Sequence, residues 1–303
     1  MEANTPRRVV ALGFFDGLHL GHKAVIDRAI ALAHTMNATP CILTFDRRPK
    51  NLARGESAEL LCDFSGREAL VRKLFGNVEL IALTFDEALR QMPWQTFAAD
   101  VLLKKLGAVA AVCGENFRFG ALGVGTPTLL QTMLPTEVVG ELSADGQTVS
   151  STVIRALLAD GKVGAANRLL GHPHFLCGPV IHGDGRGATL GFATLNIAMP
   201  TDLVKPRAGV YATVVTLGGE TYHAITNFGT RPTFYENGIY NCETHVFGLS
   251  RDCYGETAEL SLIGFVRPEQ KFDTREALIA QIREDVAIAE QILQHYDETG
   301  EYL

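Results

Sequence analysis

Short, almost wholly apolar runs alternate with stretches of helical periodicity in the first half of the chain. The runs have the length of single strands and lie at 8–12, 40–45, 78–83 and 108–113. Between and after them, apolar residues recur every three or four positions, which predicts helices over 23–36, 67–74, 94–106, 153–158 and 163–170. Strands that are apolar on both faces and alternate with helices predict a parallel sheet covered on both sides, the α/β class.

The pattern changes after Gly171-His172-Pro173. Short strands, separated by turns that contain glycine or proline, are predicted at 176–181, 209–217, 221–227, 242–247 and 259–266. This spacing predicts a small antiparallel β-barrel. A long amphipathic helix is predicted over 274–296. We therefore predict two domains, 1–171 and 172–303.

The composition fits two globular domains and narrows the set of partners. The chain has 303 residues, and its 34 acidic against 27 basic residues give a net charge of −7. This excess of acid argues against nucleic acid or an anionic membrane as partner, and no apolar run is long enough to predict a spanning helix. The six cysteines are scattered without CxxC spacing, which favours reduced thiols over a zinc cluster. The first residues lack the features of a signal peptide, so we expect a cytoplasmic protein.

The segment GFFDGLHLGH joins the first predicted strand to the first predicted helix. Gly13, Gly17 and Gly21 allow the backbone to approach a ligand closely. His19 and His22 are three residues apart, so both imidazoles can lie on one face of the helix start, where free amides favour phosphate. The pair could then stabilise charge that builds on a phosphate in a transition state. A structural turn with histidine caps, or half of a metal site, is the alternative.

Two further segments place polar groups where a nucleotide could bind. Ser150, Ser151 and Thr152 provide three hydroxyls before a predicted helix, and Arg155 follows one turn later. Hydroxyls, free amides and a guanidinium at a helix start can hold a triphosphate, although a plain helix cap is the alternative. Asn116 lies in a glycine-flanked loop, where it could contact a ligand or serve as a turn residue.

These segments together resemble the adenylyltransferase module of the prokaryotic bifunctional riboflavin kinase/FAD synthetase family. The resemblance rests on residues 13–22, 114–120 and 150–155 in this order, and it extends over residues 8–170. It implies a Rossmann-like fold with His19 and His22 as catalytic residues. It also implies a nucleotide site of Gly13, Phe15, Asp16, Gly17, Gly21, Asn116, Ser150, Ser151, Thr152 and Arg155. The chain departs from the family at Asp46-Arg47, where a Phe-x-Pro-x-Pro loop is usual.

The second half resembles the riboflavin kinase module of the same family over residues 175 to about 293. The resemblance implies that Thr194 and Asn196 lie near Mg²⁺ and ATP phosphate and that Glu243 is the general base. It further implies a nucleotide site at Gly183, Asp184, Gly185, Arg186, Gly187, Gly191 and Thr194. Taken alone, the glycines would be a flexible hairpin loop and Glu243 a solvated side chain. The family's PTAN segment reads ATLN here, with Ala193 and Leu195 in place of proline and alanine.

The resemblance implies two reactions: phosphorylation of riboflavin by ATP to give FMN, and adenylylation of FMN by a second ATP to give FAD and pyrophosphate. Mg²⁺ is the expected cofactor, and the expected partners are the small molecules ATP, riboflavin and FMN. Whether the chain forms a homo-oligomer is left open. Three alternatives remain: an FAD synthetase with a weakened or lost kinase, a flavin-binding regulator with degenerate sites, and an unrelated cytidylyltransferase with the same histidine motif. The last of these leaves residues 175–303 unexplained.

Overall fold

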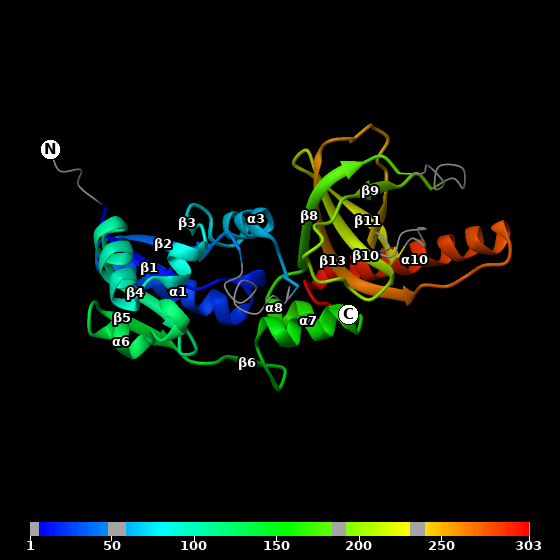
Figure 1. Ribbon diagram of the computed structural model, residues 1–303. Helices are drawn as coiled ribbons and strands as arrows, with labels where there is room; N and C mark the ends of the chain where they lie inside the picture. The colour runs from blue at the N-terminus through cyan, green and yellow to red at the C-terminus, as the bar shows by residue number, and fades with distance from the viewer. Residues whose placement is uncertain (1–5, 48–58, 184–191, 231–239, 303) are drawn as a thin grey trace. The chain divides into compact units, whose positions relative to one another are not determined.

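The computed structural model describes residues 6–47, 59–183, 192–230 and 240–302, and Figure 1 shows its elements. The chain divides into two compact units, which are described separately. The first unit comprises residues 1–58 and 67–150, and the second comprises residues 59–66 and 151–303.

A five-stranded parallel sheet forms the centre of the first unit. Its strand order is β3-β2-β1-β4-β5. The strands are β1 (Arg8–Leu12), β2 (Thr39–Phe45), β3 (Glu79–Leu83), β4 (Ala108–Gly114) and β5 (Thr136–Val139). The central strand β1 is buried at four of its five positions, as its unbroken apolar run predicts for a strand covered on both faces. The α/β prediction is confirmed.

Helices cover both faces of this sheet. Helix α1 (Leu20–Thr35) contacts β1, β2 and β4. On the opposite face, Val10 and Leu12 of β1 pack with Phe97 and Leu102 of a π-helical segment, η2 (Phe97–Lys105), in one buried cluster. Alternate residues of β1 therefore serve two separate cores. The predicted helix over 94–106 is divided between α5 (Trp94–Thr96) and this segment.

The remaining elements of the first unit are short. They are η1 (Asp16–Leu18), α4 (Glu87–Gln91), η3 (Ala121–Gly123), α6 (Pro127–Gln131) and the hairpin β6 (Ser143–Ala144) and β7 (Gln147–Thr148). Helix α3 (Phe64–Phe75) begins in residues that group with the second unit. Periodicity did not predict α4, α6 or β5, because elements of four or five residues are too short to establish a helical or a strand period.

The second unit is a closed six-stranded barrel, and the prediction of an antiparallel barrel is confirmed (Figure 1). Its strands are β8 (His174–Ile181), β9 (Leu195–Ile197), β10 (Gly209–Leu217), β11 (Glu220–Thr230), β12 (Tyr240–Val246) and β13 (Thr257–Pro268). The order around the barrel is β10-β11-β12-β9-β8-β13. Strand β9 was not predicted, because three residues carry no alternation that could identify a strand.

Helix α10 (Arg275–Thr299) packs on the outside of this barrel. Its Ala289 and Leu293 join Val210, Ile225 and Ile263 in a buried cluster. Gly264 lets the helix come close, since a Cβ at this position would lie 2.8 Å from Ile292 Cγ2. Arg267 at the end of β13 makes two bonds of 2.7 Å with the Asp285 carboxylate of the helix.

Two more helices, α7 (Ser151–Ala159) and α8 (Val163–Leu170), belong to the second unit. Helix α8 contacts β8 and β13, and its buried Asn167 is the polar link. Asn167 Nδ2 donates to Leu262 O at 2.8 Å, and His174 N donates to Asn167 Oδ1 at 2.8 Å. The predicted domain boundary after Gly171 separates α7 and α8 from the barrel on which α8 packs. That boundary stays a prediction.

Candidate active sites

The turn after β1 has an unusual backbone. Phe15, Gly17 and Leu18 all have positive φ angles, of 57°, 76° and 46°. Bulky residues rarely adopt this conformation, and strained backbone of this kind is found at ligand sites. Gly13 leaves room for the Phe15 ring, because a Cβ at this position would lie 2.8 Å from Phe15 Cζ. The space beside Gly13, which was predicted to let a ligand approach the backbone, is therefore filled in part by the Phe15 ring.

The two histidines of the turn are stacked at the start of α1. Their ring centroids are 3.5 Å apart, with 15° between the ring planes. His19 is the N-cap of the helix, and its Nδ1 accepts a hydrogen bond from His22 N at 3.3 Å. Because Nδ1 accepts, the neutral His19 ring carries its proton on Nε2. Gly21 leaves room for this ring, since a Cβ there would lie 3.3 Å from His19 Nδ1.

The His22 imidazole is neutral at pH 7. Burial of the ring, the neighbouring His19 and the Arg67 guanidinium all lower its pKa well below the ordinary value. Its Nδ1 is buried without a hydrogen-bond partner. The His22 and Phe15 rings pack edge to face, with centroids 5.3 Å apart and 80° between the planes. A neutral imidazole can donate one hydrogen bond to a phosphate oxygen without bringing a charge of its own.

Asn116 and Asp16 lie at the carboxyl edge of the same sheet. Strand β4 pairs with β1 through Leu12 and Cys113, so the loops that follow both strands leave from one edge. Asn116 is exposed, and its Nδ2 donates to Glu141 Oε1 at 2.9 Å. Asp16 is buried within the turn, at 4% exposure. The structure thus places both residues where ligands of parallel sheets bind.

The predicted hydroxyl cluster occupies the first turn of α7. The helix begins at Ser151, two residues earlier than predicted, so Ser151 and Thr152 are its first helical residues and Ser150 precedes it. Arg155 Nη2 donates to Thr152 Oγ1 at 3.2 Å. Ser150 is the last residue of the first unit, and the chain passes into the second unit at Ser151.

Asp46 of the segment that departs from the family pattern has a structural role. Its Oδ1 accepts a hydrogen bond from Phe85 N at 2.9 Å, which ties the end of β2 to the end of β3. Arg47 lies 3.6 Å from the same carboxylate and is exposed.

In the barrel, strand pairing brings three polar residues into one row. Glu243 on β12 is the register partner of Asn196 on β9 and of Asn227 on β11. Residues directly opposite each other share one face of a sheet, so the three side chains project from the same face. Asn227 was not predicted as a site residue, because only the pairing register of β11 and β12 places it opposite Glu243.

Gly183 and Asn196 are in direct contact. A Cβ at Gly183 would lie 1.9 Å from Asn196 Nδ2, so only glycine leaves room for the buried amide. The other predicted residues of this loop, Asp184, Gly185, Arg186, Gly187 and Gly191, lie outside the described residues.

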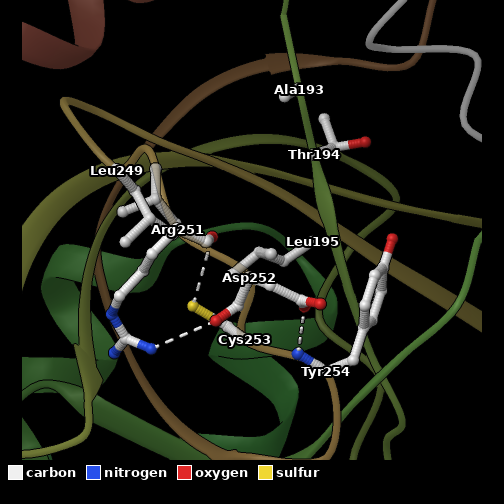
Figure 2. A pocket seen from close by; sticks show the side chains of 9 residues that line it. Ala193, Thr194, Leu195, Leu249, Arg251, Asp252, Cys253 and Tyr254 are labelled. Atoms are coloured by element: carbon white, nitrogen blue, oxygen red, sulfur yellow. Dashed lines mark hydrogen bonds between the residues drawn. The ribbon is translucent and has the colours of Figure 1, made fainter.

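A pocket lies beside the Ala193-Thr194-Leu195 segment. Its lining includes Thr194, Leu195 and the segment Arg251 to Tyr254, and Figure 2 shows Leu195 and Asp252 between Arg251 and Tyr254, below Thr194. Tyr254 N donates to Asp252 Oδ1 at 2.9 Å, which stabilises the turn formed by Arg251 to Tyr254. His245 Nδ1 is 2.7 Å from Ala193 O, and this contact restrains the Ala193-Thr194-Leu195 segment. The pocket therefore joins Thr194 to a turn that sequence reasoning did not single out.

No group of three or more His, Cys, Asp or Glu side chains among the described residues could hold a metal ion. No helix in the same part of the chain is long and apolar enough to span a bilayer. The six cysteines are free thiols, and five of them are buried, as their scattered spacing predicts.

Comparison with known proteins assigns each half to a family. A model of FAD synthetase matches residues 1–153, and a model of riboflavin kinase matches residues 170–293. Bifunctional riboflavin kinase/FMN adenylyltransferases from Listeria monocytogenes and Bacillus subtilis are each 34% identical to the chain, over 92% of it and 90% of their own length. The Escherichia coli protein of this name is 32% identical, over 93% of this chain and 92% of its own.

A solved structure shares the fold. It comes from Streptococcus pneumoniae and is titled a macrolide-efflux protein, with a TM-score of 0.83 and 28% identity over 95% of this chain and 96% of that one. The family models and the relatives agree on the order of the two modules and extend across both units. The chain belongs to the bifunctional riboflavin kinase/FMN adenylyltransferase family.

Proposed function

We propose that the chain performs both reactions of its family. The barrel unit transfers the γ-phosphoryl group of ATP to the 5′-hydroxyl of riboflavin, which gives FMN and ADP. The first unit then joins an FMN phosphate oxygen to the α-phosphorus of a second ATP and releases pyrophosphate, which gives FAD. The observation that carries the proposal is the stacked His19–His22 pair at a strained helix start, in a chain whose second half carries the Asn196–Glu243 row.

In the adenylylation step, the protein positions phosphates and stabilises charge. We assign His19 Nε2–H and the neutral His22 ring to the α-phosphate and the leaving pyrophosphate, where negative charge builds in the transition state. The amides at the start of α1 add donors that need no reorganisation. Asn116, Ser150 to Thr152 and Arg155 are proposed to bind the remaining phosphate and nucleoside groups. The proposed role of Gly13 and Phe15 is to hold the backbone of the turn in place.

In the kinase step, Glu243 is proposed to take the proton of the attacking hydroxyl. Phosphoryl transfer needs in-line positioning and charge stabilisation more than covalent chemistry from the protein. The carboxylate would orient the riboflavin hydroxyl and accept its proton as the bond to the γ-phosphorus forms. Asn227 and Asn196 flank it across the sheet, and we propose that Asn227 helps to orient the carboxylate.

The residues of this site suit Mg²⁺. Thr194 and Asn196 offer a hydroxyl and an amide oxygen, which are hard donors of the kind that Mg²⁺ prefers. The close fit of Asn196 against Gly183 fixes the amide, and a Cβ at Gly183 would fill this space. We propose that these two residues hold Mg²⁺, which supplies charge neutralisation at the ATP phosphates. The pocket of Thr194, Leu195 and Arg251 to Tyr254 is proposed to receive part of ATP.

One observation favours a second candidate, an FAD synthetase with a weakened kinase. Leu195 stands where the family has alanine, and its side chain lines the pocket beside Thr194. The bond between His245 Nδ1 and Ala193 O at 2.7 Å restrains the same segment, which lacks the family's proline.

The decisive experiment uses two separate assays on the full chain. Riboflavin with ATP and Mg²⁺ tests the kinase, and FMN with ATP and Mg²⁺ tests the adenylyltransferase, with products separated by chromatography. Both reactions should proceed. FAD formation from FMN without FMN formation from riboflavin would support the second candidate, and flavin binding without turnover in either assay would support a regulator.

A further inference from the structure

The first unit contains a buried cation that the predicted sites do not use. Arg67, in the first turn of α3, has 0% of its surface exposed. Its Nη1 donates to Thr44 Oγ1 and to Phe45 O, both at 2.9 Å. No carboxylate among the described residues forms an ion pair with it. Burying a charge without a counter-charge costs free energy of folding, and a functional role for Arg67 would explain why the chain has it.

The other edge of this guanidinium has no partner. Nε and Nη2 are both buried and make no hydrogen bond. In Arg8 and Arg267 the same two atoms bind a carboxylate through two bonds, to Glu79 at 2.7 and 3.0 Å and to Asp285 at 2.7 Å each. This edge presents two parallel N–H groups, a geometry that suits carboxylate or phosphate.

Arg67 is also linked to the histidine turn. Its Cζ lies 4.3 Å from the centroid of the Phe14 ring, within the GFFDGLHLGH segment. Thr44 connects the two, because its hydroxyl accepts from Arg67 Nη1 and donates to Phe14 O at 2.9 Å. The positive charge acts on His22, where it contributes to the lowered pKa. The guanidinium therefore lies beside the turn in which the proposed chemistry takes place.

We propose that Arg67 binds a phosphate group of the adenylylation substrates through Nε and Nη2, with Nη1 and the Phe14 ring holding the guanidinium in place. The proposal rests on the proposed adenylyltransferase function of the first unit. The phosphate belongs either to FMN or to ATP. Both present the same chemistry to a guanidinium, so the experiment must separate them.

The test compares Arg67→Lys with Arg8→Lys in the full chain. Lysine keeps a positive charge at position 67 but has no pair of parallel N–H groups. Arg8 is a matched control, since its Nε and Nη2 bind Glu79 at the amino end of the same sheet. The rate of FAD formation is measured with FMN and ATP varied independently, and FMN formation from riboflavin is measured in the same preparations.

Arg67→Lys should lower kcat/KM for FAD formation by about 10²-fold, as loss of a preorganised donor does, with kinase turnover unchanged. Arg8→Lys should stay within a few-fold of the wild type in both reactions. A raised KM for FMN alone would assign the phosphate to FMN, a raised KM for ATP alone would assign it to ATP, and a lowered kcat alone would assign it to the reacting α-phosphate.

Equal FAD formation by Arg67→Lys and the wild type would overturn the proposal, as would equal losses in Arg67→Lys and Arg8→Lys. If Trp94 fluorescence shows that Arg67→Lys does not fold, Arg67→Gln replaces it, with the same expected loss and the same overturning result. Should both variants fail to fold, Arg67 is a structural brace and the proposal is overturned. A wild-type chain that does not convert FMN to FAD would instead contradict the proposed function.

Discussion

The imidazole rings of His19 and His22 are stacked face to face, with centroids 3.5 Å apart. His19 also caps α1 through Nδ1, so its loss would disturb the helix as well as the chemistry. His19→Asn separates the two roles, because asparagine is a good N-cap but lacks the distal N–H. His19→Asn and His22→Asn should each lower FAD formation by about 10²–10³-fold, the effect of removing one preorganised donor.

Both variants should keep the wild-type rate of FMN formation, which is the internal control measured in the same sample. Near-normal FAD synthesis in both would contradict the assignment of the pair to phosphate stabilisation.

Glu243→Gln tests the general base of the kinase. Glutamine keeps the size of the side chain and much of its hydrogen bonding, but it cannot take up the hydroxyl proton. Kinase kcat should fall by about 10²–10⁴-fold, with a small change in the KM for ATP. FAD synthesis from supplied FMN should not change, and it serves as the control. Wild-type FMN formation by this variant would place the base at another residue.

Ala193→Pro with Leu195→Ala restores the family's PTAN segment. Proline fixes φ near −65°, and alanine removes bulk from the pocket beside Thr194. If the ATLN segment misplaces Thr194 and Asn196, the double substitution should raise kinase kcat several-fold and leave FAD synthesis unchanged. A kinase rate equal to that of the wild type would show that the departure is neutral and that the His245 restraint on Ala193 O suffices.

Fragments 151–303 and 172–303 test where the kinase domain begins. The shorter fragment loses Asn167, which leaves Leu262 O and His174 N without their buried partners. Each such group costs about 1–3 kcal/mol, and loss of the apolar contacts of α8 adds to this. The melting temperature of 172–303 should therefore be lower than that of 151–303 by about 10 °C or more. Equal melting temperatures and kinase rates would support the boundary after Gly171.

His174 makes the stability of the barrel unit depend on pH. Burial and the neighbouring His172 lower the pKa of His174 to about 3. Between this value and about pH 6.5, the ordinary value for histidine, the folded chain binds fewer protons than the unfolded chain. The contribution of His174 to the free energy of unfolding is thus present above pH 6.5 and falls by about 1.4 kcal/mol per pH unit below it.

His174→Phe keeps a ring but does not titrate, so its unfolding free energy should fall less steeply between pH 6.5 and 4.5 than that of the wild type. Urea unfolding followed by far-UV circular dichroism measures this difference. Parallel curves for His174→Phe and the wild type would contradict the prediction.

The sequence by itself determined the elements whose pattern is local and strong. Strand β1 has the predicted bounds, because an apolar run ending in glycine at a histidine-rich turn identifies both the strand and the sheet edge. Strand β10 also has the predicted bounds. The long amphipathic helix α10, predicted over 274–296, extends over Arg275–Thr299. The histidine turn, the hydroxyl cluster and Glu243 were predicted as site residues from their segments and from the family resemblance.

Only the tertiary structure decided which distant residues meet. The register of β11, β12 and β9 puts Asn227 and Asn196 beside Glu243, and a shift of one residue would send them to opposite faces. In the sequence, nothing distinguishes Arg67 from other charged residues at the start of a helix. Its burial, its bonds to Thr44 and Phe45 and its unpartnered edge arise from packing between segments far apart in the chain, which no local pattern records.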